Sequence, residues 1–325
     1  MGTRAGARGS DVARGTRGTR GQRGFALLVV LSALGLLALV AAAFAHVARS
    51  HIRLAASAGA SARAEAMADA GVHIAILDLV AGRGSGPGSR RLAFDSTPFL
   101  CSAGGGATLA IAVQDEAGKV DLNIASPVLI RALLLGLGVR GGEAAVDAIL
   151  DYRDQDDARR VSGAERAEYL SAGRLYGPRN GPFLAVEDLA SVLGLTQADA
   201  DRLRPFVTVN SGLMGVDAGV APRALVDALA RGFQDGGGES LLDRDSGLES
   251  GDLSVTLPPQ LRAASARRAF SIRAQARLPG GATFVREAVI EFLTSGATAF
   301  QLRRWYRGPA TIAVALPSPE MLPPC

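Results

Sequence analysis

Residues 25–45 read FALLVVLSALGLLALVAAAFA, and this stretch decides the fold class of the 325-residue chain. It contains no charged residue, and Ser32 is its only polar side chain. At about 1.5 Å per residue, a helix of this length spans a hydrocarbon core of roughly 30 Å. The sequence therefore predicts a membrane-spanning helix over residues 25–45.

The basic charge of the chain is concentrated before this helix. The whole chain carries a net charge of +4, whereas residues 1–24 contain six arginines against Asp11 and carry +5. The remaining 301 residues therefore carry −1, which argues against a general nucleic-acid-binding surface. Because arginine-rich flanks resist translocation, we expect the N-terminus to be cytoplasmic and the residues beyond about 46 to lie outside the cytoplasm.

The apolar stretch is longer than the core of an ordinary secretory signal peptide, which spans about 7–15 residues. Beyond it, apolar and small residues continue at spacings of three and four from Ala64 to Leu79. This periodicity predicts one continuous helix from Phe25 to about Val80, which faces lipid first and is amphipathic afterwards.

Four segments of the remaining chain have the pattern of β-strands. Residues 107–113 alternate apolar and polar side chains, and residues 269–278 and 282–293 are β-type runs joined by a Pro-Gly-Gly turn. Residues 300–306 add a fourth segment. We expect these strands to form one antiparallel sheet packed against the N-terminal helix.

Residues 120–210 have helical patterns and interrupt the strands. Pro127 suits the first position of a helix, and the turns at 136–138 and 194–196 break two helical runs in the manner of paired helix-hairpin-helix units. A weak repeat relates residues 120–133 to residues 216–229 at a constant offset of 96. The fold class predicted is α+β, with a long N-terminal helix on an antiparallel sheet and a large inserted α-helical domain.

The N-terminal region resembles the class III signal of type IV pilins and type II secretion pseudopilins, because a basic leader ends in Arg23-Gly24 before Phe25 opens the apolar helix. The resemblance implies that a prepilin peptidase cuts between Gly24 and Phe25 and methylates the new N-terminus. Most members carry glutamate as the fifth mature residue, which is Val29 here. Its absence is characteristic of the K component of type II secretion, and the inserted helical domain also resembles that component.

The resemblance implies a pilin-like domain organisation. Residues 1–24 form a cleaved leader, residues 25–81 the N-terminal helix, residues 82–119 and 211–325 a pilin-like α/β domain, and residues 120–210 an inserted helical domain. It further implies a single-pass protein of the bacterial inner membrane with a periplasmic globular domain.

In function, the resemblance implies a non-enzymatic minor pseudopilin at the tip of the type II secretion pseudopilus. Such a subunit initiates assembly for protein export across the outer membrane. Its expected partners are the I- and J-type minor pseudopilins, the prepilin peptidase and the inner-membrane secretion components.

The strongest cluster of candidate metal ligands lies in residues 151–165, which read DYRDQDDARRVSGAE. Counted from Asp154, the residues Asp156, Ser162 and Glu165 stand at positions three, nine and twelve, where an EF-hand supplies oxygen ligands. Position six is not the required glycine, so a true EF-hand is not expected. Because calcium is known in the K family, the resemblance implies a Ca²⁺ site at Asp154, Asp156 and Glu165, with Asp157 as an alternate ligand. A solvated acidic loop is the alternative.

The two cysteines, Cys101 and Cys325, are both expected on the oxidising side of the membrane. They could form a disulfide, stay as free thiols or pair between molecules. The three histidines all lie on the predicted N-terminal helix, so no catalytic triad or zinc site is indicated.

Two other functions share some of these features. A membrane-anchored helix-hairpin-helix DNA receptor would have similar hairpins, but residues 121–210 contain 13 acidic residues and 10 arginines, which disfavours a polyanionic ligand. A type IV pilus minor pilin would have a similar leader, but it usually keeps the glutamate and lacks the long insert.

Overall fold

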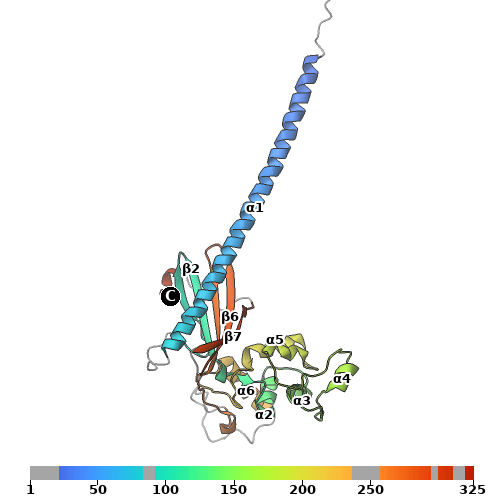
Figure 1. Ribbon diagram of the computed structural model, residues 1–325, viewed down its shortest axis with the longest axis vertical. Coiled ribbons are helices and arrows are strands. Elements are labelled where there is room, and N and C mark those ends of the chain that lie inside the picture. The colour runs from blue at the N-terminus through green and yellow to red at the C-terminus, as the bar shows by residue number, and fades with distance from the viewer. Residues whose placement is uncertain (1–21, 83–91, 236–256, 294–298, 310–318) are drawn as a thin grey trace, which may run out of the picture. The chain divides into compact units, whose positions relative to one another are not determined.

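A computed structural model describes residues 22–82, 92–235, 257–293, 299–309 and 319–325 (Figure 1). The leader before residue 22 and most of the connector at 82–89 lie outside the described residues. The chain divides into two compact units, residues 1–59 and residues 60–325.

The first unit contains the N-terminal part of α1, which runs without a break from Gln22 to Ala81. Its apolar side chains are exposed, with Phe25 72% and Phe44 76% accessible to solvent. The helix from Phe25 is long and apolar enough to cross a membrane, and none of its most apolar 18-residue window is buried. The prediction of one long, continuous helix is confirmed.

The second unit contains a five-stranded antiparallel sheet in the order β1-β2-β5-β6-β7. The strands are β1 Phe99–Gly104, β2 Ala107–Asp115, β5 Ala269–Arg277, β6 Thr283–Phe292 and β7 Phe300–Arg307. The four predicted strands are present, and β5 and β6 form the predicted hairpin. The strand β1 was not predicted, because FLCSAG combines a short apolar start with small residues.

Within the second unit, the end of α1 covers one face of this sheet (Figure 1). The buried face of the helix consists mainly of small and β-branched side chains, namely Ala64, Ala68, Val72, Ala75, Ile76 and Leu79. A Cβ built at Gly71 would lie 2.9 Å from the Cβ of Ala274, so glycine allows the helix to approach β5 closely. On the same interface, Arg286 forms ion pairs with Glu65 and Asp69, both at 2.5 Å.

A helical body is inserted between the neighbouring strands β2 and β5, and Figure 1 shows its helices gathered beyond one end of the sheet. Its elements are η2 Glu116–Gly118, β3 Val120–Asp121, α2 Pro127–Gly136, α3 Gly142–Arg153, α4 Arg166–Ser171, η3 Val186–Ser191, α5 Gln197–Leu203, η4 Arg204–Phe206, β4 Val207–Thr208, α6 Arg223–Asp235 and η7 Pro259–Leu261. The short strands β3 and β4 pair in parallel. A last 3-10 turn, η8, spans Pro319–Met321.

The weak sequence repeat corresponds to a symmetric pair of helices, α2 and α6. A Cβ at Gly136 would overlap the carbonyl oxygen of Ala228, and a Cβ at Gly232 would overlap that of Ala132. Both contacts follow the offset of 96, so each helix presents its glycine to the same position of its partner. Glycine lets the two backbones touch at this crossing.

This packing extends the helical body beyond the predicted boundary at residue 210. The same core includes α6 and continues to Leu257 and Leu261. Residues of α2 and α6 share this core, so the helical body continues past residue 210.

Polar side chains join the helical body to the sheet where the chain leaves β2 and returns to β5. The hydroxyl of Ser265 donates to the buried carboxylate of Asp115 at 2.5 Å. Lys119 donates to Glu116 at 2.8 Å and to Ser271 at 3.0 Å. Burial raises the pKa of Asp115, while the hydrogen bond from Ser265 opposes that shift.

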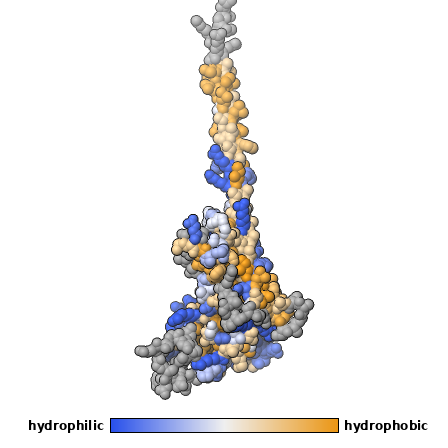
Figure 2. Space-filling view, turned by 90° about the vertical axis from the view of Figure 1, so that its left-hand side faces the viewer, coloured by the Kyte–Doolittle hydropathy of each residue, from blue (hydrophilic) through white to orange (hydrophobic). Residues whose placement is uncertain are grey.

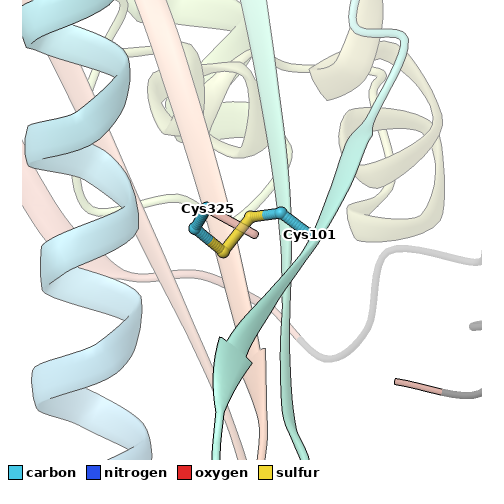
Figure 3. The surroundings of a disulfide bond; sticks show 2 residues. All are labelled: Cys101 and Cys325. Carbon is cyan, nitrogen blue, oxygen red and sulfur yellow. A yellow bond between two sulfur atoms is a disulfide. The ribbon is translucent and has the colours of Figure 1, made fainter. Parts of the chain in front are cut away.

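Cys101 on β1 and Cys325 at the end of the chain form a disulfide (Figure 3). The C-terminal residues also pair with the edge of β1, because the N–H of Ser102 donates to the carbonyl of Pro323 at 2.7 Å and the N–H of Cys325 donates to the carbonyl of Ser102 at 3.1 Å. Of the alternatives that the sequence left open, the structure contains the intramolecular bridge. It fixes the C-terminal segment to an edge strand of the sheet.

Candidate metal centre

The predicted ligands lie in the loop between α3 and α4. Asp154 is the first residue after α3, and its N–H donates to the carbonyl of Leu150, which ends the helix. Glu165 is the N-terminal flanking residue of α4, and its N–H donates to the carboxylate of Glu168 at 3.0 Å. The two helix ends therefore hold Asp154 and Glu165 at opposite ends of the loop.

The loop is folded around Asp151, which is completely buried. The guanidinium of Arg160 contacts Asp151 at 3.2 Å and Asp154 at 3.2 Å. A Cβ at Gly163 would overlap the carboxylate of Asp151, so this position requires glycine. Burial raises the pKa of Asp151, and hydrogen bonding to the Arg160 N–H partly offsets this.

Four buried oxygen atoms around this loop have no hydrogen-bond donor. They are one oxygen of Asp154, both carboxylate oxygens of Glu165 and the side-chain carbonyl of Asn180. The amide nitrogen of Asn180 donates to the carbonyl of Asp156 at 3.1 Å and to Asp157 at 2.6 Å, which leaves its oxygen as the free acceptor. Buried polar atoms in native proteins are nearly always partnered, so this set of oxygen atoms suits a cation or a hydrogen-bond donor.

The electrostatics of Glu165 favour a nearby cation. Its side chain is only 5% exposed. Burial, followed by the charges of Asp151, Asp154 and Asp157, raises the pKa of Glu165 to about 7, and the nearby side chain of Asn180 offsets only part of this rise. Burial and the charge of Asp156 also raise the pKa of Asp154. A divalent cation would reverse both effects, because it stabilises the ionised carboxylates.

Not all of the predicted ligands meet. Asp156 is exposed, and its carboxylate accepts a hydrogen bond from the N–H of Ala158 at 2.9 Å. Asp157 accepts from Asn180, and the N–H of Ser162 donates to Asp147 at 3.0 Å. Across the described part of the chain, no three Asp, Glu, His or Cys side chains form a metal-binding group. The unpartnered oxygens instead come from two carboxylates and one amide.

Sequence reasoning missed Asp151 and Asn180. Asp151 begins the run Asp-Tyr-Arg-Asp-Gln-Asp, but its position inside α3 gave no indication that it is buried. Asn180 adopts a left-handed backbone conformation (φ 48°) between Arg179 and Gly181. Asn-Gly is a turn signal, so this dipeptide could have predicted a tight turn at Asn180.

The predicted processing site, Gly24-Phe25, lies within α1, where the backbone is helical from Gln22 onward. The Phe25 side chain is exposed. The leader that would be removed lies almost entirely outside the described residues.

Comparison with known proteins identifies a relationship for the helical body. Residues 111–212 match the family described as "Type II secretion system (T2SS), protein K". No curated protein matches the chain. A solved structure described as the GspK–GspI–GspJ complex from the enterotoxigenic Escherichia coli type 2 secretion system is similar at 16% identity and a TM-score of 0.46, covering 81% of this chain and 99% of that chain.

The family match spans the end of β2, the candidate metal loop and the chain as far as Gly212. These are the residues on which the resemblance of the insert rests. Over residues 111–212, the chain is therefore similar to the family of type II secretion system protein K.

Proposed function

We propose that this protein is a minor pseudopilin at the tip of the type II secretion pseudopilus. It would initiate assembly with I- and J-type minor pseudopilins and so support protein export across the outer membrane. The observation that carries the proposal is the match of the inserted helical body to the protein K family. In the same chain, this body is joined to a long apolar helix whose side chains are exposed.

The residue at position five of the mature helix supports a place at the end of the filament. Val29 stands where most pseudopilins carry a glutamate, which pairs with the terminal ammonium of a neighbouring subunit inside the membrane. An unpaired charge at that depth is costly. A subunit at the tip has no preceding subunit whose terminal ammonium must be neutralised, so an apolar residue is suitable at this position.

Membrane insertion and processing follow from the same proposal. Six arginines precede Phe25, which favours a cytoplasmic N-terminus in the inner membrane and a periplasmic globular domain. The prepilin peptidase would cut after Gly24 and methylate Phe25. Mass spectrometry of the protein purified from membranes tests this directly: the expected chain begins at methylated Phe25, and a chain beginning at Met1 or near His46 would contradict it.

We also propose that the loop between α3 and α4 holds a calcium ion. Carboxylate and amide oxygens are the ligands that Ca²⁺ prefers, and Asp154, Glu165 and Asn180 supply four such atoms without donors. A bound ion would neutralise the buried carboxylates and link the end of α3 to the start of α4. Its contribution would be structural, since the residues around it serve to position the loop.

The two alternative functions receive less support. The hollow between the hairpin turns is lined by Arg140, Arg202 and Asp199. The guanidinium of Arg202 already donates to the carbonyls of Leu137 and Gly138. A phosphate there would meet the carboxylate of Asp199 and an engaged Arg202, which leaves Arg140 as the one available arginine among the described residues of the hollow and does not favour a DNA receptor. The match to the protein K family favours type II secretion over a type IV pilus.

The tip position can be tested in cells that carry the secretion system. Deletion of this chain should abolish secretion, and a variant with an epitope in the helical body should label filament ends. Label distributed along the filament would contradict the proposed position.

A further inference from the structure

The segment of α1 just after its apolar stretch carries a group of basic side chains. Residues 46–53 read HVARSHIR, and His46, Arg49, His51 and Arg53 are all exposed. Figure 2 shows hydrophilic side chains following the apolar stretch of the helix. The sequence contains no Asp or Glu between Phe25 and Ala64, so this stretch of helix supplies these cations with no acidic partner.

The helical spacing places these residues at the depth of lipid phosphates. Arg49 lies about 36 Å along the helix from Phe25, which is about 6 Å beyond a hydrocarbon core of roughly 30 Å. The headgroup layer on each side is about 5–7 Å thick. Side chains of a helix tilt toward its N-terminus, which is the membrane side here, so Arg53 can reach back to the same layer.

Three of the four side chains share one face. At about 100° per residue, His46, Arg49 and Arg53 fall within an arc of roughly 60°, whereas His51 points away from it. Arg49 and Arg53 are therefore neighbours on the helix surface, one turn apart. Guanidinium groups bind phosphate oxygens through two parallel hydrogen bonds, and two such groups on one face form a concentrated anion site.

We propose that Arg49 and Arg53, assisted by His46, bind the phosphate of anionic phospholipid headgroups in the leaflet where the apolar stretch ends. The proposal rests on the membrane insertion proposed above. The binding would set the depth of the helix in the membrane and retain the subunit there before it is drawn into a filament. An acidic side chain of a neighbouring subunit is the other conceivable occupant, but the position at headgroup depth favours lipid.

The test uses the full chain reconstituted into vesicles of phosphatidylcholine alone and of phosphatidylcholine mixed with phosphatidylglycerol. After gentle extraction, native mass spectrometry measures the ratio of the two lipids that stay bound. Each arginine near the membrane surface contributes about 1 kcal/mol to anionic lipid binding, or about fivefold. We expect phosphatidylglycerol to be enriched on the unaltered chain, with the enrichment reduced roughly 30-fold in the double variant Arg49→Gln, Arg53→Gln.

Arg63→Gln is the matched control, because Arg63 is an exposed arginine ten residues further along the same helix. It should retain the full enrichment. Equal enrichment in the double variant and the unaltered chain would overturn the inference, as would displacement of the lipid by inorganic phosphate at the same concentration. Insertion into both vesicles without lipid selectivity would refute only this inference, whereas failure to insert into either would refute the membrane proposal as well.

Discussion

Replacing Glu165 by glutamine should stabilise the calcium-free protein and weaken its response to calcium. The substitution keeps the size of the side chain and removes its charge. Both carboxylate oxygens of Glu165 are buried without a hydrogen-bond donor. A neutral amide avoids the cost of an unpaired charge, but it offers only one oxygen to a cation.

The magnitude follows from the pKa of Glu165, which burial and neighbouring carboxylates raise from 4.5 to about 7. Between these values the folded chain holds a proton that the unfolded chain has released, so the free energy of unfolding falls as the pH rises through this interval and is constant above it. A shift of this size corresponds to about 3 kcal/mol at pH 8. Glu165→Gln should recover about 2–3 kcal/mol of it, which is on the order of 5–10 °C in melting temperature.

The assay is thermal and urea denaturation of a soluble fragment that begins near residue 50, with a chelator or with calcium, at pH 8. For the unaltered fragment, calcium at about 100 times its dissociation constant should add about 2.7 kcal/mol. Glu165→Gln should be more stable than the unaltered fragment in chelator and should gain much less from calcium. Glu143→Gln, on the exposed side of α3, is the control and should change neither value by more than about 0.5 kcal/mol.

A lower stability of Glu165→Gln in chelator at pH 8 would contradict this expectation, because it would show that the carboxylate of Glu165 is paired with a donor. The metal site would be refuted if removal of calcium left the melting temperature of the original fragment unchanged and Asp154→Ala also had no effect on it.

Two further changes test the packing of the second unit. Replacing Cys101 and Cys325 by serine should lower the free energy of unfolding by roughly 4–5 kcal/mol, because the bridge closes a loop with a sequence separation of 224; urea denaturation with and without reductant measures it, and equal midpoints would contradict the estimate. Gly232→Ala should cost about 3 kcal/mol or more, because its Cβ would overlap the carbonyl oxygen of Ala132. Gly59→Ala, where the Cβ meets nothing within 4 Å, should be neutral or stabilising, and similar melting temperatures for the two variants would argue against the close crossing of α2 and α6.

Much of the architecture was predictable because its signals are local. The charge-free stretch from Phe25 and the spacing of small residues from Ala64 predict one helix that is exposed first and buried later. Alternating residues and a Pro-Gly-Gly turn predict the β5–β6 hairpin. Each of these patterns repeats over many residues, so a single unusual residue does not obscure it.

Other parts depend on contacts between distant segments. The strands β3 and β4 have two residues each, too few for a pattern. The repeat indicated a second helix at α6. It did not show that Gly136 and Gly232 each contact the partner helix, because that contact depends on how the two helices cross. At the metal loop, the acidic spacing identified Asp154 and Glu165, but it included the exposed Asp156 and missed Asn180, which joins the loop from 15 residues beyond Glu165.

Assembly as a minor pseudopilin can be measured on purified proteins. The soluble fragment is mixed with the corresponding domains of I- and J-type pseudopilins from the same cell, and the molar mass is measured by light scattering after gel filtration. The proposal predicts a single species that contains one copy of each chain. Elution of the fragment alone, at the mass of one chain and with the other two proteins in separate peaks, would contradict it.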